Sequence, residues 1–116
     1  MQGKKAIQAY PDGVVRIYAV GNVAQPGKMP VEGLTLTETL PFAQKTVGAM
    51  RFAQGVLVGY RIDNRLRTPR RDSVTTMHVA RTHDGTRYHI RQVQYPEDVT
   101  PPSMDLALER MAADDA

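Results

Sequence analysis

Five arginines lie close together in the middle of this 116-residue chain and carry its clearest chemical signal. They belong to residues 56–71, VLVGYRIDNRLRTPRR, where apolar and basic side chains alternate along most of the segment. A period of two is typical of a half-buried antiparallel strand. The core side would hold Val56, Val58, Tyr60, Ile62 and Leu66, and the outer side Arg61, Arg65 and Arg67, with Arg70 and Arg71 following.

The outward basic side has three possible uses. It could contact a nucleic-acid backbone, pair with an acidic protein partner, or keep an exposed edge strand soluble. Asp63 and Asp72 interrupt the positive charge, so the sequence leaves all three uses open.

No other group of residues suggests catalysis or metal binding. The chain has no cysteine, no glycine-rich phosphate loop and no HExxH or nucleophile-elbow spacing. His78 and His89 would lie among arginines, which oppose a bound cation. Four carboxylates on separate segments (Glu38, Asp63, Asp72 and Asp98) give no local acid–base pair. We therefore expect no enzyme, no catalytic residue, no metal and no cofactor.

Length and composition favour one small soluble domain spanning residues 1–116. A chain of this length has room for a single core. Its net charge of +3 and pI near 9.4 permit nucleic-acid binding without requiring it. The start lacks the apolar core of a signal peptide, and no apolar run reaches the roughly 20 residues of a membrane span. We expect no membrane partner.

The first half of the chain predicts strands separated by long loops. Residues 4–10 and 14–20 flank a Pro-Asp-Gly turn and predict a first hairpin. Residues 21–33 are rich in Pro and Gly and predict a surface loop. Residues 34–40, LTLTETL, alternate as a strand, and residues 41–55 predict a short helical turn or ordered loop. That loop holds both phenylalanines, Phe42 and Phe52, for which we expect burial.

The second half predicts a hairpin around Asp84-Gly85, a strong signal for a two-residue turn. That turn would join residues 74–83 to residues 86–95 and place Arg81 opposite Tyr88 and Val79 opposite Ile90. The apolar phase then changes parity, which a β-bulge around Arg91 and Gln92 would absorb.

The C-terminal segment 104–111 admits either helix or strand. Its residue types favour helix, whereas Met104, Leu106 and Leu108 alternate as in a closing strand. Residues 1–13 form a lead-in and residues 112–116 a flexible tail. The expected fold is all-β, a small β-barrel or sandwich-like domain with long loop excursions.

The ordered segments resemble the small head-tail connector proteins of tailed bacteriophages, of the head-closure or stopper type. The resemblance rests on AQPGKMP, KTVGAMRFAQG, YRIDNRLRTPR, DGTRYHIRQVQ and PPSMDLALERM, which occur in the family's order and cover most of residues 14–111.

This resemblance implies a non-catalytic virion protein of the phage neck, made in the host bacterial cytoplasm. Copies would form a ring between the portal or adaptor and the tail-completion proteins and close the channel over packaged double-stranded DNA. The motif KTVGAMRF would mark Lys45, Gly48, Arg51 and Phe52 as an interface or channel loop. The resemblance also favours a strand over residues 104–111.

Two other functions remain as alternatives. A nucleic-acid-binding β-barrel would interleave aromatic and basic residues on one face, but Tyr60 and Tyr88 fall on the expected core side. A tail-completion or terminator ring protein would share the all-β, multimeric character.

Overall fold

The computed structural model describes residues 5–22, 27, 32–46 and 61–112, and these contain strands and no helix. The all-β class is therefore confirmed. The strands are β1 (Ala6–Ile7), β2 (Gly13–Asn22), β3 (Glu32–Lys45), β4 (Asn64–Pro69), β5 (His78–Thr82), β6 (Arg87–Gln94), β7 (Val99–Thr100) and β8 (Ser103–Arg110).

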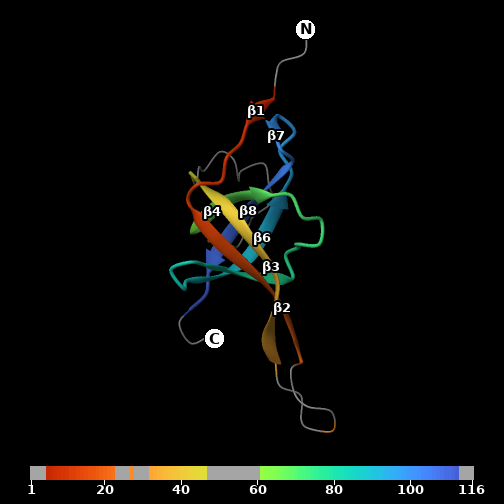
Figure 1. Ribbon diagram of the computed structural model, residues 1–116. Helices are drawn as coiled ribbons and strands as arrows, with labels where there is room; N and C mark the ends of the chain where they lie inside the picture. Colours follow the sequence, from red (N-terminus) through yellow and green to blue (C-terminus); the bar gives the residue numbers. More distant parts are fainter. Residues whose placement is uncertain (1–4, 23–26, 28–31, 47–60, 113–116) are drawn as a thin grey trace.

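Six of the strands form a closed barrel in the order β2-β3-β4-β8-β6-β5. The pairing of β2 with β5, from Val15↔Thr82 to Ala19↔His78, closes the ring. β1 and β7 make a separate two-residue parallel pair at the N-terminal end of the molecule (Figure 1). Of the barrel and sandwich architectures that the sequence allows, the pairing selects the barrel.

β8 lies between β4 and β6 in the barrel wall, and its first six residues are buried. Leu106 pairs with Leu66 of β4 on one side and with Val93 of β6 on the other. The strand predicted from the resemblance is therefore confirmed. Alternating inward positions in a barrel outweigh helix propensity here, because a strand buries all three apolar side chains on the same side. The core around them comprises Val15, Ile17, Leu40, Phe42, Leu66, Val74, Ala80, Tyr88, Ile90, Met104, Leu106 and Leu108.

The predicted first hairpin is wrong. β1 pairs with β7 rather than with β2, and β2 instead pairs with β3 and β5 along its two edges. The lead-in is held by single contacts, such as the Asp12 N–H that donates to the Phe42 carbonyl at 2.9 Å. The Pro-Asp-Gly turn directs the chain into β2, but the residues on its two sides do not pair with each other.

β3 is longer than its predicted strand at residues 34–40, and this corrects the prediction for the start of the 41–55 loop. The strand continues through Pro41 and Phe42 to Lys45. Among the described residues, β3 pairs with β4 only from Ala43 onward. Proline lacks an N–H and is tolerated where one strand edge is unpaired. The burial predicted for Phe42 is confirmed, while Phe52 lies outside the described residues.

The hairpin between β5 and β6 forms, but its register differs by one residue from the two-residue turn. The observed pairs are Arg81↔Arg87, Ala80↔Tyr88 and Val79↔His89. The Gly85 N–H donates to the Thr82 carbonyl at 2.9 Å, and the Thr82 N–H donates to the Thr86 carbonyl at 3.0 Å. With Gly85 at φ 90°, this is a three-residue loop of the kind that glycine closes. The shift places Ala80, rather than Arg81, opposite Tyr88 and in the core.

Asp84 stabilises this longer loop through its side chain. Its Oδ1 accepts a hydrogen bond from the Thr86 N–H at 3.0 Å and a short one from the Thr82 hydroxyl. The bond from the Thr82 hydroxyl, followed by the one from the Thr86 backbone, lowers the pKa of Asp84 to about 2. The loop length thus depends on hydrogen bonds that Asp84 accepts from Thr82 and Thr86, which cannot be read from the Asp84-Gly85 dipeptide alone.

The β-bulge predicted around Arg91 and Gln92 is confirmed. The register between β6 and β8 shifts between Ile90, which pairs with Leu108, and Gln92, which pairs with Ala107. The extra residue restores the inward position of Val93 and bends the strand, as barrel closure requires.

Gly13, at the start of β2, provides a test of the backbone geometry there. Its φ is 144°, and an added Cβ would lie 2.4 Å from Nδ1 of His83, whose ring stacks on Phe42. Because the His83 ring is exposed and has room to move, the main cost of Gly13→Ala is backbone strain. We expect a loss of about 1–3 kcal/mol in the free energy of unfolding, measured by urea denaturation.

Gly21→Ala is the matched control for this substitution. Gly21 lies on the same strand, would have nothing within 4 Å of an added Cβ and has no positive φ. Its effect should stay within about 0.5 kcal/mol. Equal losses for the two variants would contradict the account of Gly13.

Candidate functional site

The barrel wall contains a buried cluster of two arginines and one aspartate. Arg67 on β4 donates from Nε to Oδ1 of Asp105 on β8 at 2.6 Å and from Nη2 to Oδ2 at 2.9 Å. Arg65, two residues earlier on β4, donates from Nη2 to Oδ2 of the same carboxylate at 2.6 Å. The register Arg67↔Asp105 and Arg65↔Ala107 brings these side chains to one face of the sheet. One carboxylate therefore serves two guanidinium groups.

The burial of this cluster corrects the expected position of the basic strand face. The alternation itself is right, since Leu66 points into the core between the two arginines. However, Arg65 is only 3% exposed and Arg67 only 9% exposed, so neither faces solvent. Gln8 of the lead-in covers part of this face and accepts a hydrogen bond from Arg67 Nη1 at 3.1 Å. The outer side of β4 is thus an interior surface of the molecule.

The cluster lies beside a cavity of about 510 Å³. Its charged lining comprises Lys45, Arg65, Arg67, Asp98 and Asp105. The hydrogen bond to Asp105 is the main cause that raises the pKa of Arg67, against the opposing effect of burial. This pairing keeps Arg67 charged although its side chain is largely withdrawn from solvent.

The other three arginines of the run also lie beside carboxylates of the same chain. Arg61 Nε lies 2.7 Å from Asp63 Oδ1, and Arg70 Nε lies 2.7 Å from Asp72 Oδ1. The hydrogen bond from Arg70 to Asp72 is the main cause of the raised pKa of Arg70.

Arg70 and Arg71 also contact other strands. The guanidinium carbon of Arg70 lies 4.0 Å from the ring centroid of Tyr95, which follows β6. Arg71 Nε lies 3.7 Å from Glu38 Oε1 on β3. Three of the scattered carboxylates, Asp63, Asp72 and Glu38, therefore neutralise nearby arginines.

Asp105 is the site residue that sequence reasoning missed. It lies 38 and 40 residues from its two partners, so no local pattern connects them. The available signal was a single acid between apolar residues in a strand-like segment, MDLAL, opposite an Arg-Leu-Arg triplet of the same period. With residues 104–111 as a strand beside the arginine strand, these two patterns place Asp105 opposite the arginines.

Of the four residues predicted for the interface or channel loop, the structure places one. Lys45 is the last residue of β3, pairs with Arg65 in register and lines the cavity beside Arg67. Gly48, Arg51 and Phe52 lie outside the described residues, as do Val56, Val58 and Tyr60 of the predicted basic strand.

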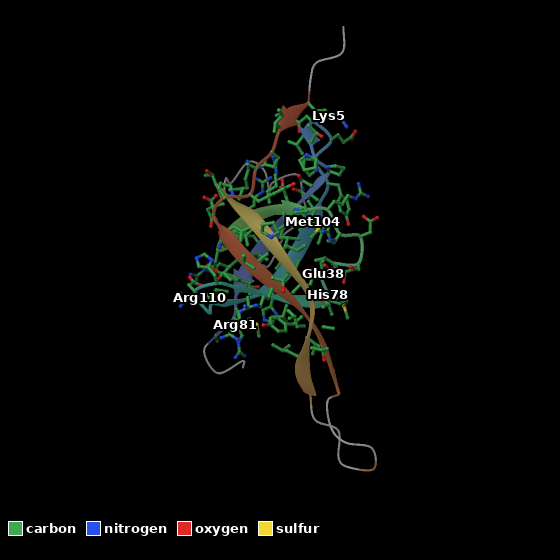
Figure 2. All side chains as sticks on the ribbon, in the orientation of Figure 1. Lys5, Glu38, His78, Arg81, Met104 and Arg110 are labelled. Carbon is green, nitrogen blue, oxygen red and sulfur yellow. The ribbon has the colours of Figure 1, made fainter. Side chains whose placement is uncertain are left out.

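A second candidate surface is the end of the β2–β3 hairpin, which we call the arm and define as residues 18–22 and 32–36. Figure 1 shows β2 and β3 running on together past the other strands at the lower end of the view. Figure 2 places Glu38 and His78 close to where the hairpin leaves the barrel, in agreement with the pairing of Ile17 with Glu38 and of Ala19 with His78.

One face of the arm is apolar because a bulge changes the register of the hairpin. The shift between Ile17 and Tyr18 leaves Thr37 unpaired, and its hydroxyl donates to the Ile17 carbonyl at 3.1 Å. Beyond the bulge, Tyr18 pairs with Leu36 and Val20 with Leu34. Without the shift the leucines would share a face with Ala19 and Gly21 instead.

The apolar face of the arm is solvent-accessible. Leu36 is 50% exposed, and Val20 and Leu34 are exposed to a similar extent. The other face carries the small or polar pairs Ala19↔Thr35 and Gly21↔Gly33. Beyond Ala19, the last residue of β2 that pairs with β5, the arm is a thin two-stranded ribbon. Within the described residues, its apolar side is uncovered.

The remaining candidate positions do not form a chemical centre within the described residues. His78 Nδ1 accepts a hydrogen bond from the Thr75 N–H at 3.2 Å, and His89 pairs with Val79. In this part of the chain no three metal-ligating side chains gather. A second cavity, of about 670 Å³, has equal numbers of basic and acidic side chains in its lining: Arg61, Arg87, Arg110, Asp63, Asp84 and Glu109.

Neither known families nor membrane topology adds to these observations. No protein-family model matches the chain, and no curated protein matches it. Across the residues that the structure describes, no helix has the length and apolarity of a membrane crossing.

Proposed function

We propose that this protein is a structural subunit of the neck of a tailed bacteriophage. Copies of it form a ring of the head-closure type between the portal or adaptor and the tail, and the ring closes the DNA channel and joins head to tail. The observation that carries the proposal is a small closed barrel with a projecting arm whose apolar face has no cover within the described chain.

Such an arm is suited to an assembly rather than to a free monomer. A two-stranded ribbon is marginally stable in water by itself, and uncovered apolar surface of this kind marks a contact with another protein. In a cyclic ring, one contact is repeated around the axis until the ring closes. An arm that leaves the barrel can reach a subunit that the barrel itself does not touch.

The Arg–Asp cluster supports a role as a rigid wall. Every arginine of residues 61–71 lies within 4 Å of a carboxylate of the same chain. The pairs of Arg65 and Arg67 with Asp105 join β4 to β8, and the hydrogen bond from Arg67 to Gln8 joins β4 to the lead-in. Together the ion pairs of this segment reduce the charge available to a nucleic-acid backbone. This favours the neck subunit over a free nucleic-acid-binding barrel.

The segments that carry the resemblance supply the rest of the proposal. Lys45 stands at the end of β3, and the motif KTVGAMRF that begins at this residue assigns Gly48, Arg51 and Phe52 to the excursion that meets a neighbour or the channel. In a ring, each charge of that excursion is multiplied by the copy number, which strengthens the field near the axis.

Loss of the gene product from the phage that encodes it tests the proposal. Particles made without the protein should be heads that have completed packaging but lack tails and lose their DNA, as seen by electron microscopy and by nuclease sensitivity of the DNA. Supplying the wild-type chain in trans should restore joined particles. Joined but over-long tails would instead assign the protein to tail termination, and normal infectious particles would refute a neck role.

A further inference from the structure

Within the part of the chain that the structure describes, the arm has an open strand edge as well as an uncovered face. Among the described residues, positions 33–41 of β3 pair only with β2, since β4 joins β3 only from Ala43 onward. An edge of this kind presents unpaired backbone N–H and C=O groups to any extended strand that approaches it.

The edge carries few of the features that usually prevent such pairing. Residues 33–40 read GLTLTETL and contain no lysine and no proline. Their single charge, Glu38, lies beyond the bulge, and its carboxylate lies 3.7 Å from Arg71. Exposed edge strands with alternating apolar residues and no blocking charge tend to associate with one another.

The sequence of the edge matches itself in one antiparallel register. If Thr35 lies opposite Thr35 of a second copy, Leu34 faces Leu36 of that copy and Leu36 faces Leu34. Cross-strand pairs of this kind, leucine beside leucine and threonine beside threonine, stabilise antiparallel sheets. This register makes two leucine pairs, and at its ends Glu32 of each copy lies opposite Glu38 of the other, where the like charges oppose further pairing. A shift of one step in either direction that keeps the faces aligned would leave one leucine pair and place a leucine opposite Glu32 or Glu38.

We infer that the free protein forms a two-fold dimer in which the β3 edges of two arms pair antiparallel about Thr35. The two hairpins then form one four-stranded sheet, β2-β3-β3-β2. Tyr18, Val20, Leu34 and Leu36 of both copies share one face of that sheet. The contact is self-complementary, as a two-fold axis requires.

This dimer does not depend on the proposed neck function. A two-fold contact differs from the head-to-tail contact that closes a cyclic ring, so either proposal can fail without the other. Its short paired segment falls below the area of a standard interface, about 1,200–2,000 Å². We therefore expect a reversible dimer at micromolar concentration.

Introduced cysteines test the register directly, because the natural chain contains none. Directly opposed residues of an antiparallel pair have Cβ atoms about 4.5–5.5 Å apart, close to the spacing that a disulfide spans. Thr35→Cys should form a disulfide-linked dimer under mild oxidation. Since thiols held together have an effective concentration of roughly millimolar, cross-linking of a dilute sample should be at least about tenfold faster than for an unpaired thiol.

Thr39→Cys is the matched control. It replaces the same residue type on the same strand at another exposed position, but lies beyond the bulge and opposite Arg16. It should cross-link only at the rate of random collision. Equal rates for the two variants, or no cross-link for Thr35→Cys, would overturn the inference.

Sedimentation of the unmodified chain gives a second readout. The wild-type protein should show a concentration-dependent dimer, and Leu36→Lys should shift it to monomer because two ammonium groups would be brought to the paired edge. A wild-type protein that stays monomeric at every concentration up to about 100 μM would also contradict the dimer.

Discussion

Asp105→Ala is expected to lower the free energy of unfolding by about 3–5 kcal/mol. The substitution leaves Arg65 and Arg67 buried side by side without the carboxylate that accepts three hydrogen bonds from them. Breaking a buried pair is costly because the remaining charges lose their hydration and their partner together. Urea denaturation followed by circular dichroism measures the loss.

Two further variants show whether the loss of stability comes from the burial of the charges or from the loss of any ion pair. Asp72→Ala removes the exposed partner of Arg70 and should cost no more than about 1 kcal/mol. Replacing Arg65, Arg67 and Asp105 together by methionine, leucine and leucine should recover most of the stability, since a buried ionic cluster is often no better than apolar packing. A small loss for Asp105→Ala, similar to that of Asp72→Ala, would show that the cluster is open to solvent.

Leu106→Ala is expected to cost about 2–5 kcal/mol, the second large effect. Leu106 is fully buried on β8, between Leu66 of β4 and Val93 of β6. Its truncation leaves a cavity that strands hydrogen-bonded on both sides cannot close by moving inward. Thermal and urea unfolding should both report the change.

Leu36→Ala makes the same chemical change on the arm and serves as the control. Leu36 is half exposed on the outer face, so its truncation should change the free energy of unfolding of the barrel by less than about 1 kcal/mol. If both variants lost equal stability, the arm would have to be part of the packed core rather than a projecting ribbon.

Local patterns along the chain were enough to predict several elements of this fold. The all-β class and the bulge near Arg91 follow from alternation and from its change of parity. The inward position of Leu66 follows in the same way. These features depend only on which side of a strand each residue occupies, and that information is contained in neighbouring residues.

Features that depend on long-range pairing or on turn chemistry could not be predicted in this way. The pairing of β1 with β7 joins residues more than ninety positions apart. The register of the β5–β6 hairpin follows the hydrogen bonds of Asp84 rather than the Asp-Gly dipeptide alone. The alternation placed Arg65 and Arg67 correctly outside the core, but only the folded lead-in and Asp105 show that this outer side is itself buried.

Arg65 and Arg67 are buried in the barrel wall. The proposed function therefore depends on exposed surfaces elsewhere in the protein. Within the described residues, the apolar side chains of the arm are the exposed surface proposed for contacts with other subunits. Their role depends on assembly, so the copy number in the particle is the property that follows most directly from it.

Quantitative mass spectrometry of purified phage particles is the most direct test of the neck assignment. The account predicts a small fixed number of copies per particle, in a simple ratio to the portal protein, in particles that contain DNA. Absence of the protein from such particles, or a copy number that varies with the preparation, would contradict it.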